Sequence, residues 1–250
     1  MYRRGASSLI GRTIASIEAP DDWYLKRIDA ATFADATVGA RVGELDRIGK
    51  LMIVETTRGA IGLRFGMTGI LLIDDEPVIA ELEYSSKRLA PEWNRFRAIF
   101  EEGGSMAMND PRRLGGVELD PDLSQLGPDA WRITPEELHV LFGRYTVATK
   151  ALLLNQKRVA GLGNLLVDEL LWRSGVSPLR PAHRVDAEAL RALTNELGPM
   201  LDELYQRGGS NCGDHFGERN VQGRCPKDGA EMVHDTVGGR STWWCRTHQR

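Results

Sequence analysis

KALLLNQKRVAGLGNLLVDELLWRSGVSPLRP, residues 150–181, decides the fold of this chain. Its leucines and a valine form an apolar side that predicts a first helix, and Gly161 predicts the end of that helix because glycine adopts left-handed backbone angles without strain. Gly161-Leu162-Gly163 then predicts a reversal of the chain, and Asn164 is placed to cap a second helix over residues 165–174. The stretch therefore predicts two helices joined by a glycine-rich turn.

The start of the second predicted helix offers unpaired backbone N–H groups beside the side-chain amide of Asn164. Such an arrangement suits a phosphate, because the helix dipole and the free donors both favour an anion. The alternative is a tight helical hairpin in an all-α core, which is the commoner origin of an isolated glycine-rich turn. The turn alone leaves both interpretations open.

The complete run QKxVAGxGNxxxDExLWxxxxxPxRPA is far more specific than its turn. It closely resembles the helix–two-turn–helix segment of the formamidopyrimidine-DNA glycosylase and endonuclease VIII family. The resemblance implies a base-excision-repair DNA glycosylase and AP lyase that binds damaged double-stranded DNA, everts a nucleotide and cleaves through a Schiff base. The matching positions implied to hold DNA are Lys157, Gly163 and Asn164.

Composition fits an ordinary soluble protein of 250 residues, which is long enough for one or two cores. No stretch is long enough to span a bilayer and no signal-peptide core is present, so we expect a cytoplasmic, nucleoid-associated protein without a membrane partner. Three cysteines are too few for a disulfide framework and favour a metal site. Nothing requires more than a monomer.

The charge balance is unusual for a DNA-binding protein, because the net charge is −3 and such proteins are expected to be basic. Residues 1–130 hold 16 Lys and Arg against 21 Asp and Glu, whereas residues 131–250 hold 16 against 14. A local basic face can still bind phosphates. The acidic total supports one rival interpretation, a zinc-stabilised protein with no role on DNA.

The chain is predicted to be a multidomain α+β protein. Apolar residues alternate in strand fashion between residues 35 and 108, which predicts an antiparallel β-sandwich or barrel. Of the two, we expect the β-sandwich, over residues 1–110. The expected strands lie at residues 13–17, 51–54, 61–65, 70–73, 80–84, 95–100 and 105–108. Residues 111–133 are rich in Gly and Pro and are interpreted as a linker.

A helix–two-turn–helix domain is expected over residues 134–220. Thr134-Pro135-Glu136-Glu137 predicts a helix start with a capping box. Asp186 predicts the cap of a further helix that runs to Arg207 and is bent or broken at Pro199. The helical part of the chain thus ends before residue 221.

Residues 221–250 form a polar segment that needs a staple to stay folded. Two turn-forming pairs, Cys225-x2-Asp228 and Cys245-x2-His248, stand sixteen residues apart, the spacing of a β-hairpin zinc finger. All four side chains are possible Zn²⁺ ligands, although the family usually has cysteine at each position. We expect bound zinc, with a metal-free finger as the alternative.

Three further segments resemble family segments that reach into DNA. RIGKL resembles the segment of the β-hairpin lysine, which makes Lys50 a catalytic or phosphate-binding candidate; the alternative is an ordinary exposed lysine. RFGMTG resembles HxGMxG, which implies that Met67 fills the gap left by an everted nucleotide. NDPRRLG resembles NDPRRFG, which implies that Arg112 faces the orphaned base and Leu114 wedges into the stack. Alone, Met67 and Leu114 would more often be core residues.

Two more residues gain roles from the resemblance. Arg240, in the predicted hairpin, would contact the phosphate beside the damaged nucleotide, although an arginine in a turn is usually just solvated. Glu169 would assist opening of the deoxyribose ring, and the alternative is a carboxylate favoured near a helix start by the dipole.

The N-terminus departs from the family, whose nucleophile is the α-amine of an N-terminal proline followed by a general-acid glutamate. Here Tyr2-Arg3-Arg4-Gly5 already matches the family's first helix. Three interpretations follow. The true protein begins upstream of Met1, or the chain is a catalytically reduced relative that only binds damaged or abasic DNA, or Lys50 supplies a primary amine for Schiff-base chemistry.

Overall fold

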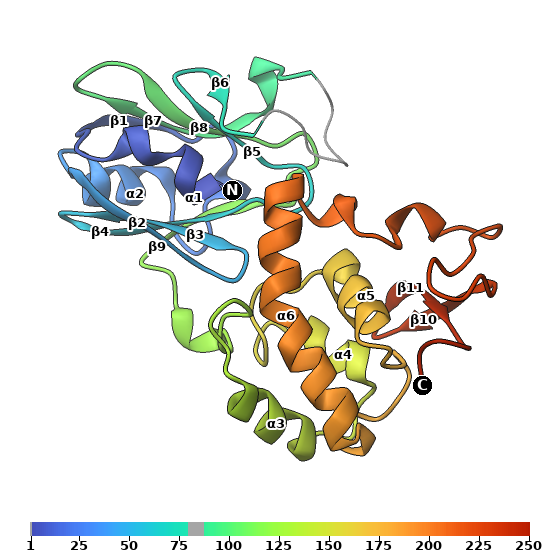
Figure 1. Ribbon diagram of the computed structural model, residues 1–250. Coiled ribbons are helices and arrows are strands. Elements are labelled where there is room, and N and C mark those ends of the chain that lie inside the picture. The colour runs from blue at the N-terminus through green and yellow to red at the C-terminus, as the bar shows by residue number, and fades with distance from the viewer. Residues whose placement is uncertain (1, 80–87) are drawn as a thin grey trace. The chain divides into compact units, whose positions relative to one another are not determined.

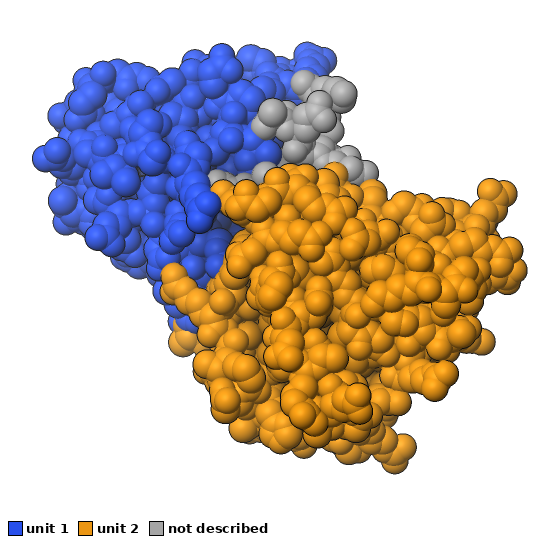
Figure 2. Space-filling view, viewed as in Figure 1, with its two compact units in different colours: residues 1–123 blue, residues 124–250 orange. Residues whose placement is uncertain are grey.

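The computed structural model describes residues 2–79 and 88–250, so the strand expected at residues 80–84 lies outside the described residues. The chain forms two compact units, residues 1–123 and residues 124–250 (Figures 1 and 2). Among the described residues, no helix combines the length and the apolar character needed to cross a bilayer.

Unit 1 contains two antiparallel sheets (Figure 1). One has the strand order β1-β7-β8-β5-β6 and the other the order β2-β3-β4-β9. The strands are β1 (Ile14–Glu18), β2 (Val42–Ile48), β3 (Leu51–Thr56), β4 (Gly59–Arg64), β5 (Ile70–Ile73), β6 (Glu76–Pro77), β7 (Asn94–Phe100), β8 (Ser105–Asn109) and β9 (Gly116–Leu119). The helices are α1 (Tyr2–Gly5) and α2 (Ala30–Thr37), with 3₁₀ turns at Ser7–Leu9, Asp22–Tyr24 and Pro91–Trp93.

A single cluster of buried apolar side chains joins the two sheets. It includes Ile14 and Phe96 from one sheet and Val54 and Leu63 from the other, and Phe33 of α2 packs into it. Two sheets that share one core form a β-sandwich, as the alternation of apolar residues predicted.

Strand β9 lies inside the stretch expected to be a linker without regular structure. It pairs with β4 through Ile61↔Leu119 and Leu63↔Val117, and Val117 is completely buried. The sequence does not indicate this strand, because glycine and proline neighbours obscure the pattern of its four residues. Regular structure in unit 1 therefore continues to Leu119.

Unit 2 contains helices α3 (Pro135–Arg144), α4 (Thr149–Leu154), α5 (Asn164–Arg173) and α6 (Ala187–Arg207), followed by the hairpin β10 (Met232–Val237) and β11 (Arg240–Cys245). Short 3₁₀ turns lie at Leu123–Gln125, Ala182–Arg184, Ser210–Cys212 and Phe216–Glu218. The predicted capping box of α3 is present, because Thr134 and Glu137 each accept a hydrogen bond from the other's backbone N–H. A second buried apolar cluster joins all four helices.

Three helix boundaries differ from expectation. Helix α4 ends at Leu154, seven residues before Gly161, because Asn155 is extended and its Oδ1 accepts the N–H of Lys157. Helix α5 begins at Asn164 with Gly163 as its N-cap and no side-chain cap. Helix α6 runs unbroken through Pro199, because buried leucine and methionine side chains on both sides of the proline hold it against the core.

Candidate nucleic-acid interface and metal centre

Met67 and Leu114 project from two loops of unit 1. Met67 lies between β4 and β5 and Leu114 lies between β8 and β9, with exposed fractions of 52% and 44%. The alternative that both are core residues is therefore wrong. Gly66 fixes how closely the loops approach, since a Cβ there would lie 2.6 Å from the backbone of Leu114.

One buried carboxylate, that of Asp110, fastens both loops. Its Oδ1 accepts the hydroxyl of Thr68 at 2.6 Å, next to Met67, and its Oδ2 accepts the N–H of Gly115 at 2.8 Å, next to Leu114. The Tyr24 hydroxyl also donates to Oδ2 at 3.3 Å, and burial together with Asp110 raises the pKa of Tyr24, so this donor keeps its proton. Asp110 belongs to the NDPRRLG run, but only the fold shows what its side chain holds.

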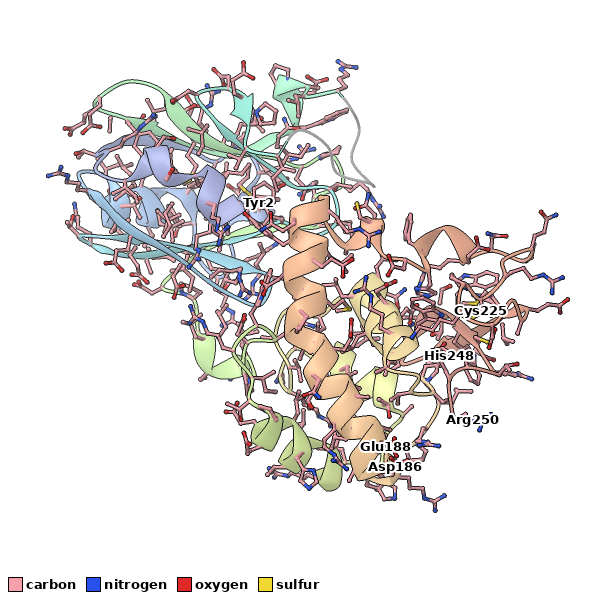
Figure 3. All side chains as sticks on the ribbon, viewed as in Figure 1. Tyr2, Asp186, Glu188, Cys225, His248 and Arg250 are labelled. Atoms are coloured by element: carbon pink, nitrogen blue, oxygen red, sulfur yellow. The ribbon has the colours of Figure 1, made fainter. Side chains whose placement is uncertain are left out.

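The Met67 loop, residues 65–69, has a second brace. Tyr2 stacks on Phe65 with ring centroids 3.9 Å apart, and its hydroxyl donates to the carbonyl of Gly69 at 3.0 Å (Tyr2 is labelled in Figure 3). Both ends of the loop are thus held while Met67 between them stays exposed.

Lys50 and Arg112 are exposed, as both predictions need. Lys50 lies in the two-residue turn between β2 and β3, where Gly49 has a φ of 57° and the pair Ile48↔Leu51 closes the hairpin. Arg112 precedes the exposed Leu114 by two residues in the loop of residues 110–115. Neither position distinguishes a role on DNA from that of an ordinary surface side chain.

In unit 2, the turn between α4 and α5 is built by the side chain of Gln156. Its amide nitrogen donates to the carbonyls of Leu154 and Leu162, and its Oε1 accepts the N–H of Gly161, all within 3.0 Å. Lys157 next to it is exposed, and its Nζ donates to Gln125 at 3.2 Å. The turn therefore has one conformation fixed from inside.

The N-terminus of α5 keeps free backbone donors, because the first intrahelical bond to Gly163 comes from Val167. Asn164 does not cap this helix. Its amide nitrogen instead donates to the carbonyl of Ser241 in the hairpin at 3.0 Å, while its buried Oδ1 has no hydrogen-bond partner in the described structure. The prediction of a cap was wrong because the actual partner lies 77 residues away in sequence.

Lys150 fixes the same end of the hairpin from inside the unit. It is completely buried, its Nζ lies 2.6 Å from Asp168 Oδ1, and it donates to Ser241 O and Thr242 Oγ1. Burial lowers the pKa of Lys150, and Asp168 opposes that shift. The second Asp168 oxygen pairs with Arg219. Lys150 and Asp168 both lie in residues 150–181, but nothing in the sequence indicated that they pair. No sequence pattern pointed to Arg219 either.

Arg240 follows the hairpin turn Gly238-Gly239, whose φ values of 60° and 72° suit a type I′ turn. The turn packs on α4, since a Cβ on Gly238 would lie 3.2 Å from Ala151. Ser241, the neighbour of Arg240, accepts from both Asn164 and Lys150. The structure thus brings Gly163, Asn164 and the exposed Arg240 together at one end of α5.

Glu169 is buried, with an exposed fraction of 1%. Its Oε1 accepts from Arg173 and from the N–H of Asp214, and its Oε2 accepts the N–H of His215 and lies 3.0 Å from that residue's ring. Burial alone raises the pKa of Glu169, but the bonds from His215, Arg173 and Asp214 outweigh it and lower the pKa to about 2.

A carboxylate that stays ionised and fully hydrogen-bonded is a poor general acid or base at neutral pH. The position of Glu169 therefore favours fastening the segment after α6 to α5 over the predicted part in sugar-ring opening. Nor is Glu169 at the helix start, since it is the sixth residue of α5. His215, its main partner, had no sequence signal.

Cys225, Asp228 and Cys245 form a group that could hold a metal ion, with one donor atom from each lying within 4.8 Å of the others. Two thiols and a carboxylate fit Zn²⁺. His248 lies outside this group: its Nε2 is 2.7 Å from the carbonyl of Trp172, and only its backbone N–H reaches Cys245 Sγ (Cys225 and His248 are labelled in Figure 3). The structure brings together three of the four side chains that were predicted as ligands.

A cavity of about 770 Å³ opens in unit 2 between residues 177–186 and the chain's last residues. Arg180, Arg184, Trp244 and Arg246 are among its lining residues, and it contains none of the predicted site residues. The exposed loops and turns, rather than this cavity, carry the predicted interface.

Two family models match the chain. The formamidopyrimidine-DNA glycosylase N-terminal domain matches residues 1–117, and the formamidopyrimidine-DNA glycosylase H2TH domain matches residues 126–214. A formamidopyrimidine-DNA glycosylase of Paracoccus denitrificans is 33% identical, over 97% of this chain and 95% of its own length. One from Xanthomonas campestris is 30% identical, over 98% and 95%.

Solved structures of the Lactococcus lactis enzyme share the fold. The enzyme bound non-covalently to DNA with an abasic site gives a TM-score of 0.83 at 24% identity, covering 99% of this chain and 96% of that one. Its complex with DNA containing FAPY-dG gives 0.81 at 22% identity, covering 100% and 97%. With one-third identity to the Paracoccus enzyme over almost the whole length, this chain belongs to the formamidopyrimidine-DNA glycosylase family.

Proposed function

We propose that the chain is a base-excision-repair DNA glycosylase and AP lyase that binds damaged duplex DNA, everts the damaged nucleotide and cleaves the strand through a Schiff base. Family membership supports the reaction class. The observation that carries the proposal is the exposed pair Met67 and Leu114, held on two loops by the single buried carboxylate of Asp110.

Exposed methionine and leucine side chains on braced loops suit a partner into whose apolar interior they can insert. A base stack is such an interior, and apolar wedges that enter it replace an everted nucleotide and keep the gap open. Arg112, beside Leu114, would face the base left without a partner. The braces matter because a wedge on a flexible loop would lose conformational entropy when it binds, and this loss would weaken binding.

Phosphate binding falls to unit 2. The N-terminus of α5 offers backbone donors at Gly163 and beyond, and Asn164, Lys157 and Arg240 add an amide and two positive charges around it. These contacts explain how a chain with a net charge of −3 can bind DNA, since local charges rather than the total release counterions.

The lyase step needs an amine. At an abasic site the amine adds to C1′ of the open sugar and water leaves, forming an iminium; loss of a C2′ proton then expels the 3′ phosphate. We propose Lys50, exposed at the β2–β3 turn, as an amine that this chain offers for that step. Its alternative role is to hold a phosphate.

Zn²⁺ is proposed as a structural ion held by Cys225, Asp228 and Cys245. His248, which lies outside this group, would join it through Nδ1, because its Nε2 faces the Trp172 carbonyl. When bound, it would supply the staple that this polar hairpin needs. The two sets of proposed DNA contacts lie on one chain, which supports a monomer. A DNA partner supports action on the nucleoid in the cytoplasm.

Borohydride trapping on a duplex with one abasic site tests the chemistry. The wild-type chain, Lys50→Ala and Lys50→Arg are compared, because arginine keeps the charge but does not form the iminium. Loss of the adduct in both variants, with binding retained in Lys50→Arg, identifies Lys50 as the nucleophile. An adduct in all three keeps the function and overturns the role of Lys50. Tight binding by wild type with no adduct would identify a chain that only binds DNA.

The wedge is tested separately by binding. Met67→Ala and Leu114→Ala should each lower the preference for abasic over intact duplex about tenfold, since each removes an apolar side chain from the stack. Ile10→Ala, at a position 53% exposed in the same unit, is the matched control and should leave the preference unchanged. Equal effects in all three variants would contradict the assignment.

A further inference from the structure

Arg113, between Arg112 and Leu114, is held differently from its neighbours. Its backbone has a φ of 57°, which is uncommon for a residue with a side chain. Its guanidinium grips Asp21 with two contacts, Nε to Oδ2 at 2.5 Å and Nη2 to Oδ1 at 2.6 Å. The side chain of Asp21 is only 11% exposed, so this two-pronged ion pair is partly shielded from water.

Trp23 completes the arrangement. The Arg113 guanidinium lies 5.6 Å from the centre of its ring and the Lys26 ammonium lies 3.1 Å from it, so two cations face one indole. Lys26 also donates to the Trp23 carbonyl at 2.9 Å, which holds the residue while 57% of it stays exposed. Asp21, Trp23 and Lys26 belong to one short segment, 89 residues before the loop that they grip.

The loop of residues 110–115 is therefore fixed at two points. Asp110 closes its base through the N–H of Gly115, and Arg113 ties its tip to Asp21. Left-handed backbone angles at a non-glycine residue are strained and persist only where contacts impose them. The ion pair is the contact that imposes them here, and Arg112 and Leu114 remain exposed on either side.

We propose that Asp21, Trp23 and Arg113 form a clamp that positions Arg112 and Leu114, so that Arg113 and Asp21 determine how the protein discriminates the base opposite the lesion. This inference rests on the proposed function. Arg113 is a positioning residue, because its guanidinium is committed to Asp21 and Trp23. Arg112 makes the contact, and the clamp sets where Arg112 stands.

Unit 1 contains a matched arrangement away from this loop. Arg12 grips Asp74 with two contacts of 2.7 Å, and its guanidinium lies 5.5 Å from the ring of Phe100. The same three chemical groups thus occur twice, once under the loop of residues 110–115 and once at a strand end. Arg12→Lys removes the same kind of ion pair and provides the control for Arg113→Lys.

The test measures equilibrium binding to duplexes with a tetrahydrofuran abasic analogue opposite each of the four bases, at several salt concentrations. In Arg113→Lys and Asp21→Asn, the affinity ratio between the best and worst opposite base should fall about fivefold. That change corresponds to about 1 kcal/mol, the loss expected when the two-pronged Arg113–Asp21 ion pair no longer positions Arg112. Arg12→Lys should keep the wild-type ratio. Urea unfolding shows whether the two lysine variants lose similar stability, which would remove stability as the cause.

Arg113→Gly separates the clamp from the backbone angle, because glycine takes positive φ without strain. It should lose discrimination as Arg113→Lys does; retention of the wild-type ratio would overturn the clamp. A salt slope reduced by about one in Arg113→Gly would also overturn it, because Arg113 would then contact a phosphate directly.

The same assay, with an intact duplex added, separates the clamp from the proposed function on which it rests. A wild-type chain that binds abasic duplex no better than intact duplex would sink the proposed function. A wild-type chain that prefers abasic duplex but treats all four opposite bases alike would overturn only the clamp, and so would wild-type discrimination in Arg113→Lys.

Discussion

The carboxylate of Glu169 accepts hydrogen bonds from two backbone N–H groups and from Arg173, and it also faces the ring of His215. Its pKa of about 2 lies below the usual value of about 4.3 for the unfolded chain. A group whose pKa is depressed by folding stabilises the fold above the unfolded value, and that stabilisation is lost as pH falls toward the folded value. For Glu169 the loss falls between about pH 4.5 and pH 2.

Glu169→Gln should therefore lower the free energy of unfolding at pH 7 by roughly 3 kcal/mol and flatten its decline below pH 4.5. Urea unfolding at pH 7, 4 and 3 measures both. Glu203→Gln is the control: the pKa of Glu203 is also about 2, but its side chain is 43% exposed, so water screens it and the loss should be clearly smaller. A Glu169→Gln protein of wild-type stability that has lost lyase activity would instead establish the catalytic role.

Sequence patterns predicted which side chains matter here but not which partners they contact. The resemblance pointed to Met67, Leu114 and Asn164, because short runs preserve which side chains a loop carries. It did not reveal that Asn164 bonds Ser241, or that Asp110 joins two loops, because those partners are 77 and 42 residues away. Patterns within one element predicted the sandwich and the helices, whereas partners far apart in sequence had to be seen in the fold.

At the scale of elements, the hairpin β10–β11 is held to α4 and α5 at both ends. Lys150, Asn164 and the close packing of Gly238 fix the end that carries Arg240. At the other end, the indole N–H of Trp172 donates to Cys225 Sγ at 3.4 Å, and the Trp172 carbonyl lies 2.7 Å from Nε2 of His248. The position of Arg240 therefore depends on groups in two helices.

Removing the buried amine should release the Arg240 end. Lys150→Met leaves Asp168 with less compensation in a buried site, and breaking such a pair costs about 3–5 kcal/mol. The double variant Lys150→Met/Asp168→Asn should recover part of that loss, because the uncompensated buried carboxylate is gone, although Arg219 loses its partner. It should not restore the bonds to Ser241 and Thr242. Urea unfolding gives the first effect and DNA affinity the second; full recovery of affinity in the double variant would contradict the link.

Zinc binding at the end of the hairpin that carries Cys245 should depend more on Cys225 and Asp228 than on His248. Wild type, prepared without chelator, should hold close to one equivalent of zinc, and Cys225→Ser and Asp228→Asn should lower it because each removes a donor of the converging group. His248→Ala should keep most of the metal, since the ring of His248 lies outside the converging group. Zinc content by plasma emission spectroscopy decides. A His248→Ala protein as depleted as Cys225→Ser would show that Nδ1 of His248 also binds the ion.

For the whole molecule, we expect DNA affinity to depend on where the cations lie rather than on the net charge of −3. Lys157 lies in the turn before α5, and Arg240 precedes Ser241, which accepts from Asn164 at the N-terminus of α5; Arg184 and Arg246 instead line the cavity. Salt screens exposed charges beyond a Debye length of about 8 Å, so each of these cations acts locally. Charges in the two places should therefore affect DNA binding differently.

Lys157→Ala and Arg240→Ala should each reduce the slope of log affinity against log salt by about 0.9, because each neutralises one phosphate and releases one counterion. Arg184→Ala changes the net charge by the same amount and should leave the slope unchanged. Fluorescence anisotropy with an abasic duplex between 50 and 200 mM salt, roughly the range over which such contacts dominate, measures all three. Equal slopes in all three variants would mean that a diffuse field, rather than contacts at the start of α5, attracts the DNA. A wild-type slope near zero would favour the interpretation that the acidic total first raised, a zinc-stabilised protein that does not act on DNA.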